Sequence, residues 1–464
     1  MFTATLSRLR WNWRRDWFLP IMALVFLALS VQYTFKAAHN KSAFVRWREQ
    51  ILQIDQGLKL YEYYHYPNPP IMALLLRPLA ELPPVVGALI WFYLKVGMAA
   101  AAFWACVRMV ESGGMPFPAT AKAATLLLCA SPLIGDLQHG NINILILFLV
   151  AACLYAFHRG HDGLAGVFLA LAICCKVTPA LFVFYFLWKR QWKLLAGCTA
   201  GLSLFLFFVP SLFLGWHNNL VLLTSWYQQM IVPFLRDGVI TSEHPNQSLP
   251  GVLCRLLTHS PSFCAYPNDV YTPTEYHNFL SLSMTQLHWI IRLAQCLFAL
   301  LVILLCRQPS RVRGGWQLCA EFGIICVGML LFSERTWKHH SVVLLLPFAV
   351  VAYSLATQIW NRRAKYAVVG LLGVALGLMM SASGIGSERA ADLAQVYGVY
   401  LWAFLILLGV QTWMLWKMAR PQASLRACGV HSMATVAPCA IPRTPSGDSE
   451  CGRAAGLAGP ARIQ

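Results

Sequence analysis

The stretch GALIWFYLKVGMAAAAFWACV, residues 87–107, is a continuous apolar run that is long enough to cross a lipid bilayer as one helix. A transmembrane β-barrel would instead show segments of about ten residues with alternating hydrophobicity. Hydrophobic residues make up 58% of the 464 residues and charged residues 12%, and similar apolar runs recur along the chain. We therefore predict an all-α polytopic membrane protein.

The basic residues of the chain set its orientation in the membrane. Three short loops, residues 189–193, 307–313 and 361–365, carry three Lys or Arg each and no acid, so we place them in the cytoplasm. The arginine-rich N-terminal arm belongs on the same side, before an uncleaved first helix. Because the net charge of +18 is spread over such loops and the termini, we expect no nucleic-acid partner. We expect a multi-pass protein of a bacterial plasma (inner) membrane with a cytoplasmic N-terminus.

Hydropathy predicts about 10 to 12 membrane segments, with two longer outer loops at residues 36–84 and 216–283. We expect the second loop to fold as short helices over the site. Beyond residue 417 the composition shifts to Ala, Gly, Pro, Ser and Arg, which predicts a membrane domain, 1–417, and a disordered cytoplasmic tail, 418–464. The predicted segments are 18–33, 85–110, 119–133, 142–157, 164–188, 194–214, 285–306, 316–332, 341–358, 366–382 and 395–416.

Segment 164–188 conflicts with this orientation if it crosses the membrane once, because the later basic loops would then lie outside. The conflict disappears if the segment enters the membrane and returns, with a turn at Lys176 and Pro179. Each arm then has about 12 residues, or roughly 18 Å of helix, which is short for a hydrocarbon core of about 30 Å. Such arms are tolerated only where protein buries them or where they line a cavity, so we expect a site at this turn.

In this topology five polar motifs reach the same outer face of the membrane. A membrane protein that gathers His, Asn, acids and prolines on one side is expected to have a polar site there. The motifs are YPNPP (66–70), GDLQHGNIN (135–143), KVTP (176–179), EHPNQS (243–248) and SERTWKHH (333–340).

The first outer loop contains apolar residues at helical spacing, followed by a proline-rich turn. The spacing predicts an amphipathic helix on the outer leaflet, although a helix that merely covers the bundle has the same pattern. The prolines of PNPP fix the backbone, so we expect Tyr66 and Asn68 in an extended, stiff turn. The apolar residues of the predicted helix are Phe44, Trp47, Ile51, Ile54 and Leu58.

The order of these motifs resembles glycosyltransferase family 87. The resemblance covers about residues 36–358 and rests on G-x-x-x-Y at 57–61, YPNPP with a following L-x-x-PL, HGNIN before a helix, and K-x-TP inside the broken segment. It implies a type C glycosyltransferase-like bundle. It also implies transfer of a hexose, usually mannose, from a polyprenyl-phosphate carrier to a lipid or glycan acceptor at the outer face, with inversion at the anomeric carbon.

The chain departs from the family where the general base is expected. Family members place an aspartate early in the first outer loop, and the aligned residue here is Ser42, which cannot accept a proton unaided at neutral pH. Another carboxylate would have to serve, and the candidates are Asp136, Glu243 and Glu62. For Asp136 and Glu243, helix capping or ion pairing is the alternative role.

The same motifs supply candidate ligands for the donor and the acceptor. Lys176 is the first candidate for the donor phosphate, with a snorkelling or helix-terminal lysine as the alternative. Arg335, Lys338 and His339 form a second group, which also suits an interfacial anchor. The candidates for sugar or acceptor binding, some of which could serve only the loop backbone, are Tyr66, Asn68, His139, Asn141, Asn143, His244, Asn246 and Gln247.

We expect no metal site, because the adjacent His339 and His340 do not project together and no outer-face spacing repeats a metal-binding pattern. No cofactor is expected, and a divalent cation stays open. A disulfide between Cys254 and Cys264 also stays open.

Two other functions remain at this point: a secondary transporter, whose sites also use broken helices, and a non-catalytic membrane protein that binds a lipid-linked sugar as a scaffold.

Overall fold

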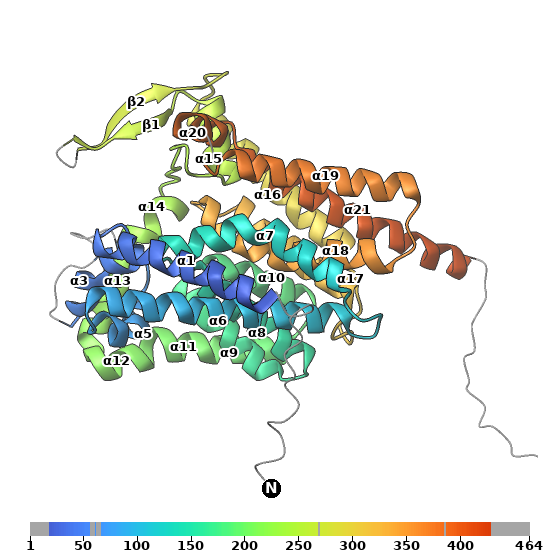
Figure 1. Cartoon of the computed structure of the whole chain (residues 1–464), viewed down its shortest axis with the longest axis horizontal. Helices are drawn as coiled ribbons and strands as arrows, with labels where there is room; N and C mark the ends of the chain where they lie inside the picture. The colour runs from blue at the N-terminus through green and yellow to red at the C-terminus, as the bar shows by residue number, and fades with distance from the viewer. Residues whose placement is uncertain (1–17, 56–60, 62–65, 268–269, 385–386, 428–464) are drawn as a thin grey trace, which may run out of the picture. The chain divides into compact units, whose positions relative to one another are not determined.

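The computed structural model describes residues 18–55, 61, 66–267, 270–384 and 387–427 (Figure 1). The chain divides into a unit of Met1–Lys417 and a second unit of Met418–Gln464. Of the second unit, only the continuation of the last helix is described.

Helices make up most of the described chain. Seven of the described helices are long and apolar enough to cross a membrane, which confirms the helical polytopic fold. The helices are α1 (Phe18–Ala38), α2 (Ala43–Arg46), α3 (Arg48–Leu52), α5 (Pro70–Ala80), α6 (Pro84–Glu111), α7 (Ala119–His139), α8 (Asn143–His158), α9 (Asp162–Cys175), η2 (Thr178–Ala180), α10 (Leu181–Trp188), α11 (Trp192–Ser203), η3 (Leu204–Phe208), α12 (Val209–Leu214), α13 (Trp216–Met230), α14 (Val232–Leu235), α15 (Leu249–Leu257), α16 (Met284–Leu305), α17 (Trp316–Leu331), η5 (Lys338–Leu344), α18 (Leu345–Thr357), α19 (Arg362–Ser381), α20 (Glu388–Val396) and α21 (Val399–Ala427).

The predicted broken segment is confirmed. Helix α9 ends at Cys175, Lys176 adopts an extended backbone, and a 3-10 turn leads into α10. The two ends of the pair that lie away from Lys176 meet the same loop. Arg313 pairs with Asp162 at the start of α9, and Lys189, after α10, donates to the carbonyl of Gln308. The chain therefore turns back on itself between α9 and α10, and Lys176 lies at the turn.

Helices α9 and α11 pack very closely. A Cβ on Gly166 would lie 2.1 Å from the carbonyl oxygen of Leu194, and one on Gly197 would lie 2.3 Å from that of Gly163. Glycine is therefore required at both contacts, as at close helix crossings within membranes. This packing fixes the arm of the broken pair that carries Lys176.

The segment that follows α11 contains an irregular turn. Residues 204–208 form a π-helix before α12, because Pro210 has no backbone N–H to donate to the carbonyl of Leu206. The amide of Asn219 donates to that carbonyl instead, at 2.9 Å. One side chain from α13 thus satisfies the group that the proline leaves free.

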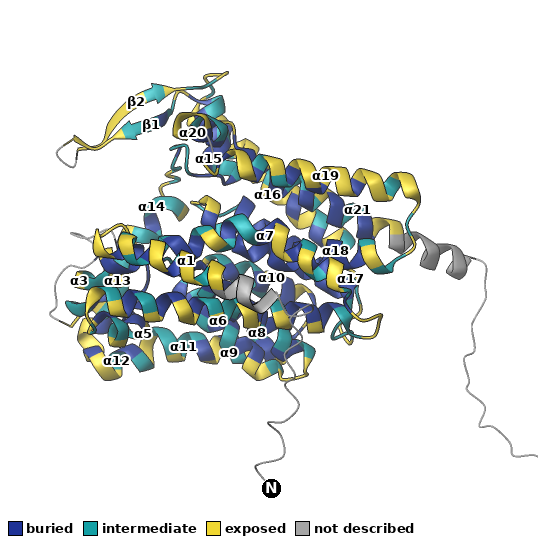
Figure 2. Cartoon of the chain, viewed as in Figure 1, coloured by how far each residue is buried: buried dark blue, intermediate teal, exposed yellow. Residues whose placement is uncertain are grey.

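Burial separates a central layer from the surrounding helices (Figure 2). Every residue of α17 except Gln317 is buried, and so is most of α18. The other long helices expose many large apolar side chains, as expected for surfaces that face lipid. The candidate site described below is built on the end of this central layer.

The prediction of one continuous amphipathic helix in the first outer loop is wrong. The structure has two short helices, α2 and α3, which meet at Trp47. Phe44, Ile51 and Ile54 are buried in the protein core and do not face a lipid leaflet. The alternative is correct, since these helices cover the bundle. Leu58 lies outside the described residues.

Two elements of the loops were not predicted. Helix α5 begins at Pro70, where proline fits the first helical position, while residues 66–69 form the expected non-helical turn. In the second loop, β1 (Pro261–Ala265) pairs antiparallel with β2 (Thr272–Tyr276) beside the short helices. The hairpin lies near α15 and α20 (Figure 1), and Arg389 of α20 pairs with Glu275 of β2.

Candidate functional site

A small pocket with an empty volume of about 280 Å³ lies at the break between α9 and α10. Its polar lining comes from four segments that are far apart in the sequence: the start of α8, the break itself, the loop after α17, and η5. The central layer closes its floor with Met329 and Leu330. The polar residues of the lining are Asn143, Lys176, Thr178, Ser333, Thr336 and His340.

Behind the pocket runs a chain of buried polar groups. Lys95 of α6 donates to the carbonyl oxygen of Asp136 at 2.6 Å, and its ammonium lies 3.4 Å from the carboxylate. The same carboxylate accepts from the amide of Asn143 at 2.9 Å and from the N–H of Ile144 at 3.3 Å. Each buried charge thus has partners, as its desolvation requires.

This chain fixes how Asn143 meets the pocket. Since the Asn143 amide nitrogen is bound by Asp136, its oxygen points the other way and accepts from the ammonium of Lys176 at 2.7 Å. Asp136 therefore positions a neutral acceptor for the lysine. The remaining donor capacity of the ammonium faces the pocket that it lines.

The turn between α7 and α8 depends on glycine. Gly140 ends α7 with a φ of 72°, a left-handed conformation that glycine adopts readily. A Cβ there would lie 2.3 Å from the hydroxyl oxygen of Ser42 and 2.7 Å from that of Tyr33. The HGNIN motif is thus pressed against the first outer loop.

Histidines of two motifs form a stack beside the pocket. The rings of His139 and His339 are 4.5 Å apart and nearly parallel, with Trp337 edge-on to both. The Asn141 amide lies 3.2 Å from Nε2 of His339. Four sequence-predicted candidates, His139, Asn141, Asn143 and His339, are thus brought together next to Lys176. Among the described residues, no group of His, Cys, Asp and Glu has an arrangement suited to a metal ion.

Asn246 and Gln247 use their amides inside the protein. Asn246 donates to the carbonyls of Thr241 and Glu334 and accepts from the N–H of Thr336. Gln247 donates to the carbonyl of Gln395 and accepts from the N–H of Tyr400. The bonds of Asn246 hold the loop after α17 in place at the pocket. They correspond to the backbone role that was left open for both residues.

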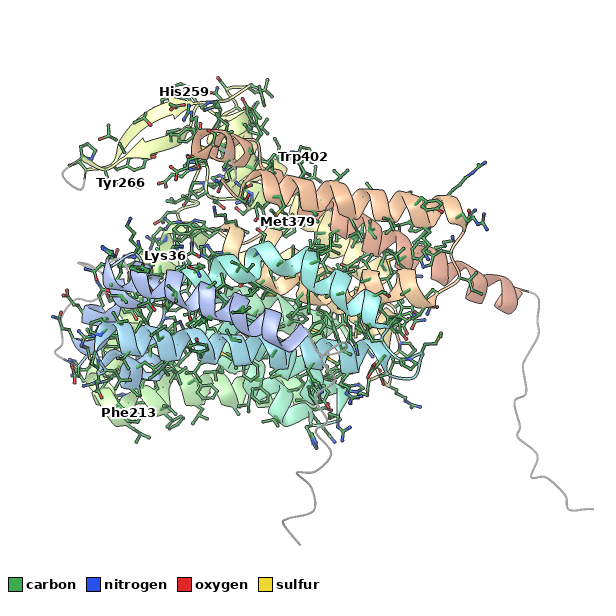
Figure 3. The ribbon with its side chains drawn as sticks, viewed as in Figure 1. Lys36, Phe213, His259, Tyr266, Met379 and Trp402 are labelled. Carbon is green, nitrogen blue, oxygen red and sulfur yellow. The ribbon has the colours of Figure 1, made fainter. Side chains whose placement is uncertain are left out.

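Glu243 and His244 lie against the hairpin and α20. Tyr266 follows β1 and is labelled in Figure 3, and its hydroxyl donates to Glu243 at 2.8 Å. The His244 ring stacks on Phe263 and lies 3.4 Å from the carboxylate of Asp392. Burial lowers the pKa of His244, so its ring is neutral at pH 7. Neither residue belongs to the pocket lining.

The remaining candidates divide between the pocket and its surroundings. Tyr66 is buried close to Cys175, the residue before Lys176, and Asn68 is held near it by a bond from Tyr61 to its carbonyl. Arg335 donates to the hydroxyl of Thr241 and Lys338 to the carbonyl of Ala382. Glu62 lies outside the described residues.

The geometry can be compared with known proteins. The model of glycosyltransferase family 87 matches residues 64–334, more than half of the chain. The chain belongs to glycosyltransferase family 87. The matched range contains the HGNIN turn, the broken span and Lys176.

Three curated relatives carry mannosyltransferase names. One is a polyprenol-phosphate-mannose-dependent alpha-(1-2)-phosphatidylinositol pentamannoside mannosyltransferase of Mycolicibacterium smegmatis, 29% identical over 45% of this chain and 51% of the relative. Two polyprenol-phosphate-mannose-dependent alpha-(1-2)-phosphatidylinositol mannoside mannosyltransferases are each 24% identical. The M. smegmatis protein is aligned over 63% of this chain and 61% of its own length, and the Mycobacterium tuberculosis protein over 66% of each. The chain thus spans about half to two thirds of the length of these relatives.

One solved structure is similar to this family 87 chain at low identity. It is ArnT from Cupriavidus metallidurans in the apo state, with a TM-score of 0.32 and 15% identity, covering 85% of this chain and 78% of that one.

Ser42, the residue that sequence analysis expects at the position of the family aspartate, lies in the site region. It is fully buried, and its hydroxyl shares a 2.8 Å hydrogen bond with Tyr33 next to Gly140. The first outer loop therefore reaches the HGNIN motif, but it brings a hydroxyl to this position and no carboxylate.

Sequence reasoning missed two charged residues of the family 87 chain that the structure places at or behind the pocket. Lys95 interrupts the apolar run of residues 87–107, and an ionisable residue inside such a run is itself a signal of function. Glu334 belongs to the SERTWKHH motif, and nothing in its local sequence selected it as a candidate. Its carboxylate lies 3.1 Å from Arg335 and interacts with Lys176.

Proposed function

We propose that this family 87 chain transfers a hexose, mannose in the first instance, from a polyprenyl-phosphate carrier to a lipid or glycan acceptor. Its activity would lie at the outer face of a bacterial plasma membrane, with the N-terminus, the basic loops and the tail after residue 417 in the cytoplasm. Inversion at the anomeric carbon follows the family. The relatives named as polyprenol-phosphate-mannose-dependent enzymes support this donor, and their phosphatidylinositol mannosides suggest a glycolipid acceptor.

The observation that carries the proposal is the ammonium of Lys176 at the break of a membrane segment. It lines the pocket and is oriented by the hydrogen bond that it donates to Asn143. It is also close to Asp136 and Glu334. A charge in such a place is costly unless it serves a polar ligand. A sugar phosphate that reached the pocket would meet a fixed cation in surroundings of low dielectric constant, where the attraction is strong.

The other candidate ligands have roles in keeping with their positions. His139, Asn141 and His339 offer ring nitrogens and an amide to sugar hydroxyls, next to the cation. Arg335 and Lys338 lie outside the pocket lining and would add to the field that attracts the donor phosphate. As the phosphate leaves, negative charge grows on its oxygens, and Lys176 would stabilise that charge.

Lys176→Met tests the proposal. The substitution keeps the length of the side chain and removes its charge, so the Km for polyprenyl-phosphate mannose should rise roughly tenfold or more, the equivalent of about 1–3 kcal/mol for a lost charge-assisted bond. Transfer of labelled mannose to phosphatidylinositol mannoside by the purified protein in liposomes measures this. Lys193→Met, an exposed lysine in the predicted cytoplasmic loop, is the matched control.

Two outcomes would contradict the proposal. Unchanged donor Km and turnover in the Lys176→Met protein, with the fold intact by thermal unfolding, would reduce the lysine to an anchor.

Ser42 in place of the family aspartate favours a second candidate, a non-catalytic protein that binds lipid-linked sugar. Donor binding by the unchanged protein without any transfer would support that candidate.

A further inference from the structure

The proposed transfer needs a proton acceptor close to the phosphate site. The acceptor hydroxyl becomes a competent nucleophile only as it loses its proton in the transition state. At the position of the family aspartate stands Ser42, whose hydroxyl is already engaged with Tyr33. The carboxylate must therefore come from another part of the molecule.

Two acids of the described chain interact electrostatically with Lys176, namely Asp136 and Glu334. Asp136 is fully buried, and both of its carboxylate oxygens already accept bonds from Lys95, Asn143 and the backbone. A carboxylate so occupied has little capacity left to take a proton from a substrate. Asp136 is therefore a positioning residue, which orients Asn143 and through it Lys176.

Three other described acids, all of the second outer loop, are paired away from the pocket. Glu243 accepts from Tyr266, Asp237 pairs with Arg236, and Glu275 pairs with Arg389. These partners belong to the hairpin, to α20 or to the same stretch of the second outer loop. Of the two acids that interact with Lys176, Glu334 is therefore the one whose carboxylate is still available.

Glu334 does not itself line the pocket, but its backbone is held at the pocket edge. Its carbonyl accepts from the amide of Asn246, and its neighbours Ser333 and Thr336 both line the pocket. The side chain is 31% exposed, so a substrate hydroxyl has access to it. One carboxylate oxygen lies 3.1 Å from Arg335. The other accepts no hydrogen bond from the part of the chain that the structure describes.

We propose that Glu334 is the general base of the transfer and takes the role of the aspartate that the first outer loop lacks. This inference rests on the proposed function. The acceptor oxygen would form a bond to the anomeric carbon while its proton passes to the Glu334 carboxylate. The bond from that carbon to the phosphate oxygen breaks, and its electron pair leaves with polyprenyl phosphate, whose charge Lys176 stabilises. Glu334 then releases the proton to water.

The electrostatics of Glu334 suit this role. Burial raises the pKa of Glu334 to about 7, while the neighbouring Arg335 and Lys176 act in the opposite direction. A base is most effective when its pKa is close to the working pH, because it is then both ionised and able to hold a proton. The ionised fraction, and with it the rate, should fall as the pH drops through about 7.

The test compares Glu334→Gln and Glu334→Asp with the unchanged chain, from polyprenyl-phosphate mannose to phosphatidylinositol mannoside across pH 5–9. Glu334→Gln keeps the shape and removes the proton acceptor, so we expect kcat to fall about 100-fold or more with little change in donor Km, and the acid limb of the profile to disappear. Glu334→Asp should recover at least part of the rate and keep an acid limb. Asp237→Asn, an exposed acid of the second outer loop, should behave as the unchanged chain does.

The possible failures are distinguishable. If Glu334→Gln keeps full kcat and the acid limb, the base is elsewhere while the proposed function stands. If Gln and Asp variants lose activity equally and with a raised donor Km, Glu334 has only a structural role. If the unchanged protein transfers no mannose at any pH, the proposed function fails, and the base with it.

Discussion

At the scale of single residues, sequence reasoning identified Lys176 and most of the pocket motifs, but it did not resolve which side chains bind one another. Depth in the membrane follows from position along the chain, so a lysine at the turn of a broken span could be recognised. The direction in which Asn143 presents its amide depends on Asp136 and Lys95, which belong to other helices. Such pairings depend on the rotation of each helix about its axis, which hydropathy does not give.

The Lys95 and Asp136 pair leads to a prediction about stability. Both side chains are fully buried, so Lys95→Met leaves an uncompensated carboxylate in the protein interior. We expect a loss of about 3–5 kcal/mol, the usual result of removing one partner of a buried pair. The Lys95→Met/Asp136→Asn protein should be more stable than the single lysine variant, because no lone charge remains.

Thermal unfolding of the purified variants in one detergent measures this difference. Equal melting temperatures for Lys95→Met and the unchanged protein would show that water reaches the pair, and that its charges do not need each other.

At the scale of elements, the helices that hydropathy predicted are present, and the errors lie in the loops. The broken span was inferred from a conflict between charge and topology, and loop contacts at Arg313 and Lys189 confirm it. The two short helices at Trp47 and the hairpin β1–β2 were missed. The apolar residues of the two short helices pack on protein, and a pattern alone does not distinguish burial in protein from burial in lipid.

The close packing of α9 on α11 gives a prediction at this scale. Gly197→Leu would place a side chain where even a Cβ lies 2.3 Å from the carbonyl oxygen of Gly163. We expect α9 to move away, with a destabilisation of at least about 1–3 kcal/mol and a loss of transfer activity, because Lys176 follows α9 directly.

Gly370→Leu in α19 is the matched control, since a Cβ there meets no atom within 4 Å. It should leave the melting temperature and the transfer rate close to those of the unchanged protein. Equal tolerance of both substitutions would mean that the contact between α9 and α11 does not position the site.

At the scale of the whole first unit, five motifs were expected to share one face, but only three of them line the pocket. HGNIN, KVTP and SERTWKHH contribute to its lining, whereas EHPNQS braces the loop after α17 from behind. Tyr66 of the proline turn lies close to Cys175, the last residue of α9. Charge and hydropathy could assign the motifs to one side of the membrane, but only the fold of the long loop decides which of them meet.

The orientation of the unit in the membrane is the last prediction. The loops at 307–313 and 189–193 meet each other at the start and end of the broken span, and their lysines and arginines predict a cytoplasmic position. With native cysteines replaced, a cysteine at the exposed Ser310 should react with a membrane-impermeant maleimide only after the membrane is opened. One at the exposed Thr274, on the hairpin, should react in intact cells. The reverse pattern would place Lys176 and Glu334 towards the cytoplasm, and transfer at the outer face would then be impossible.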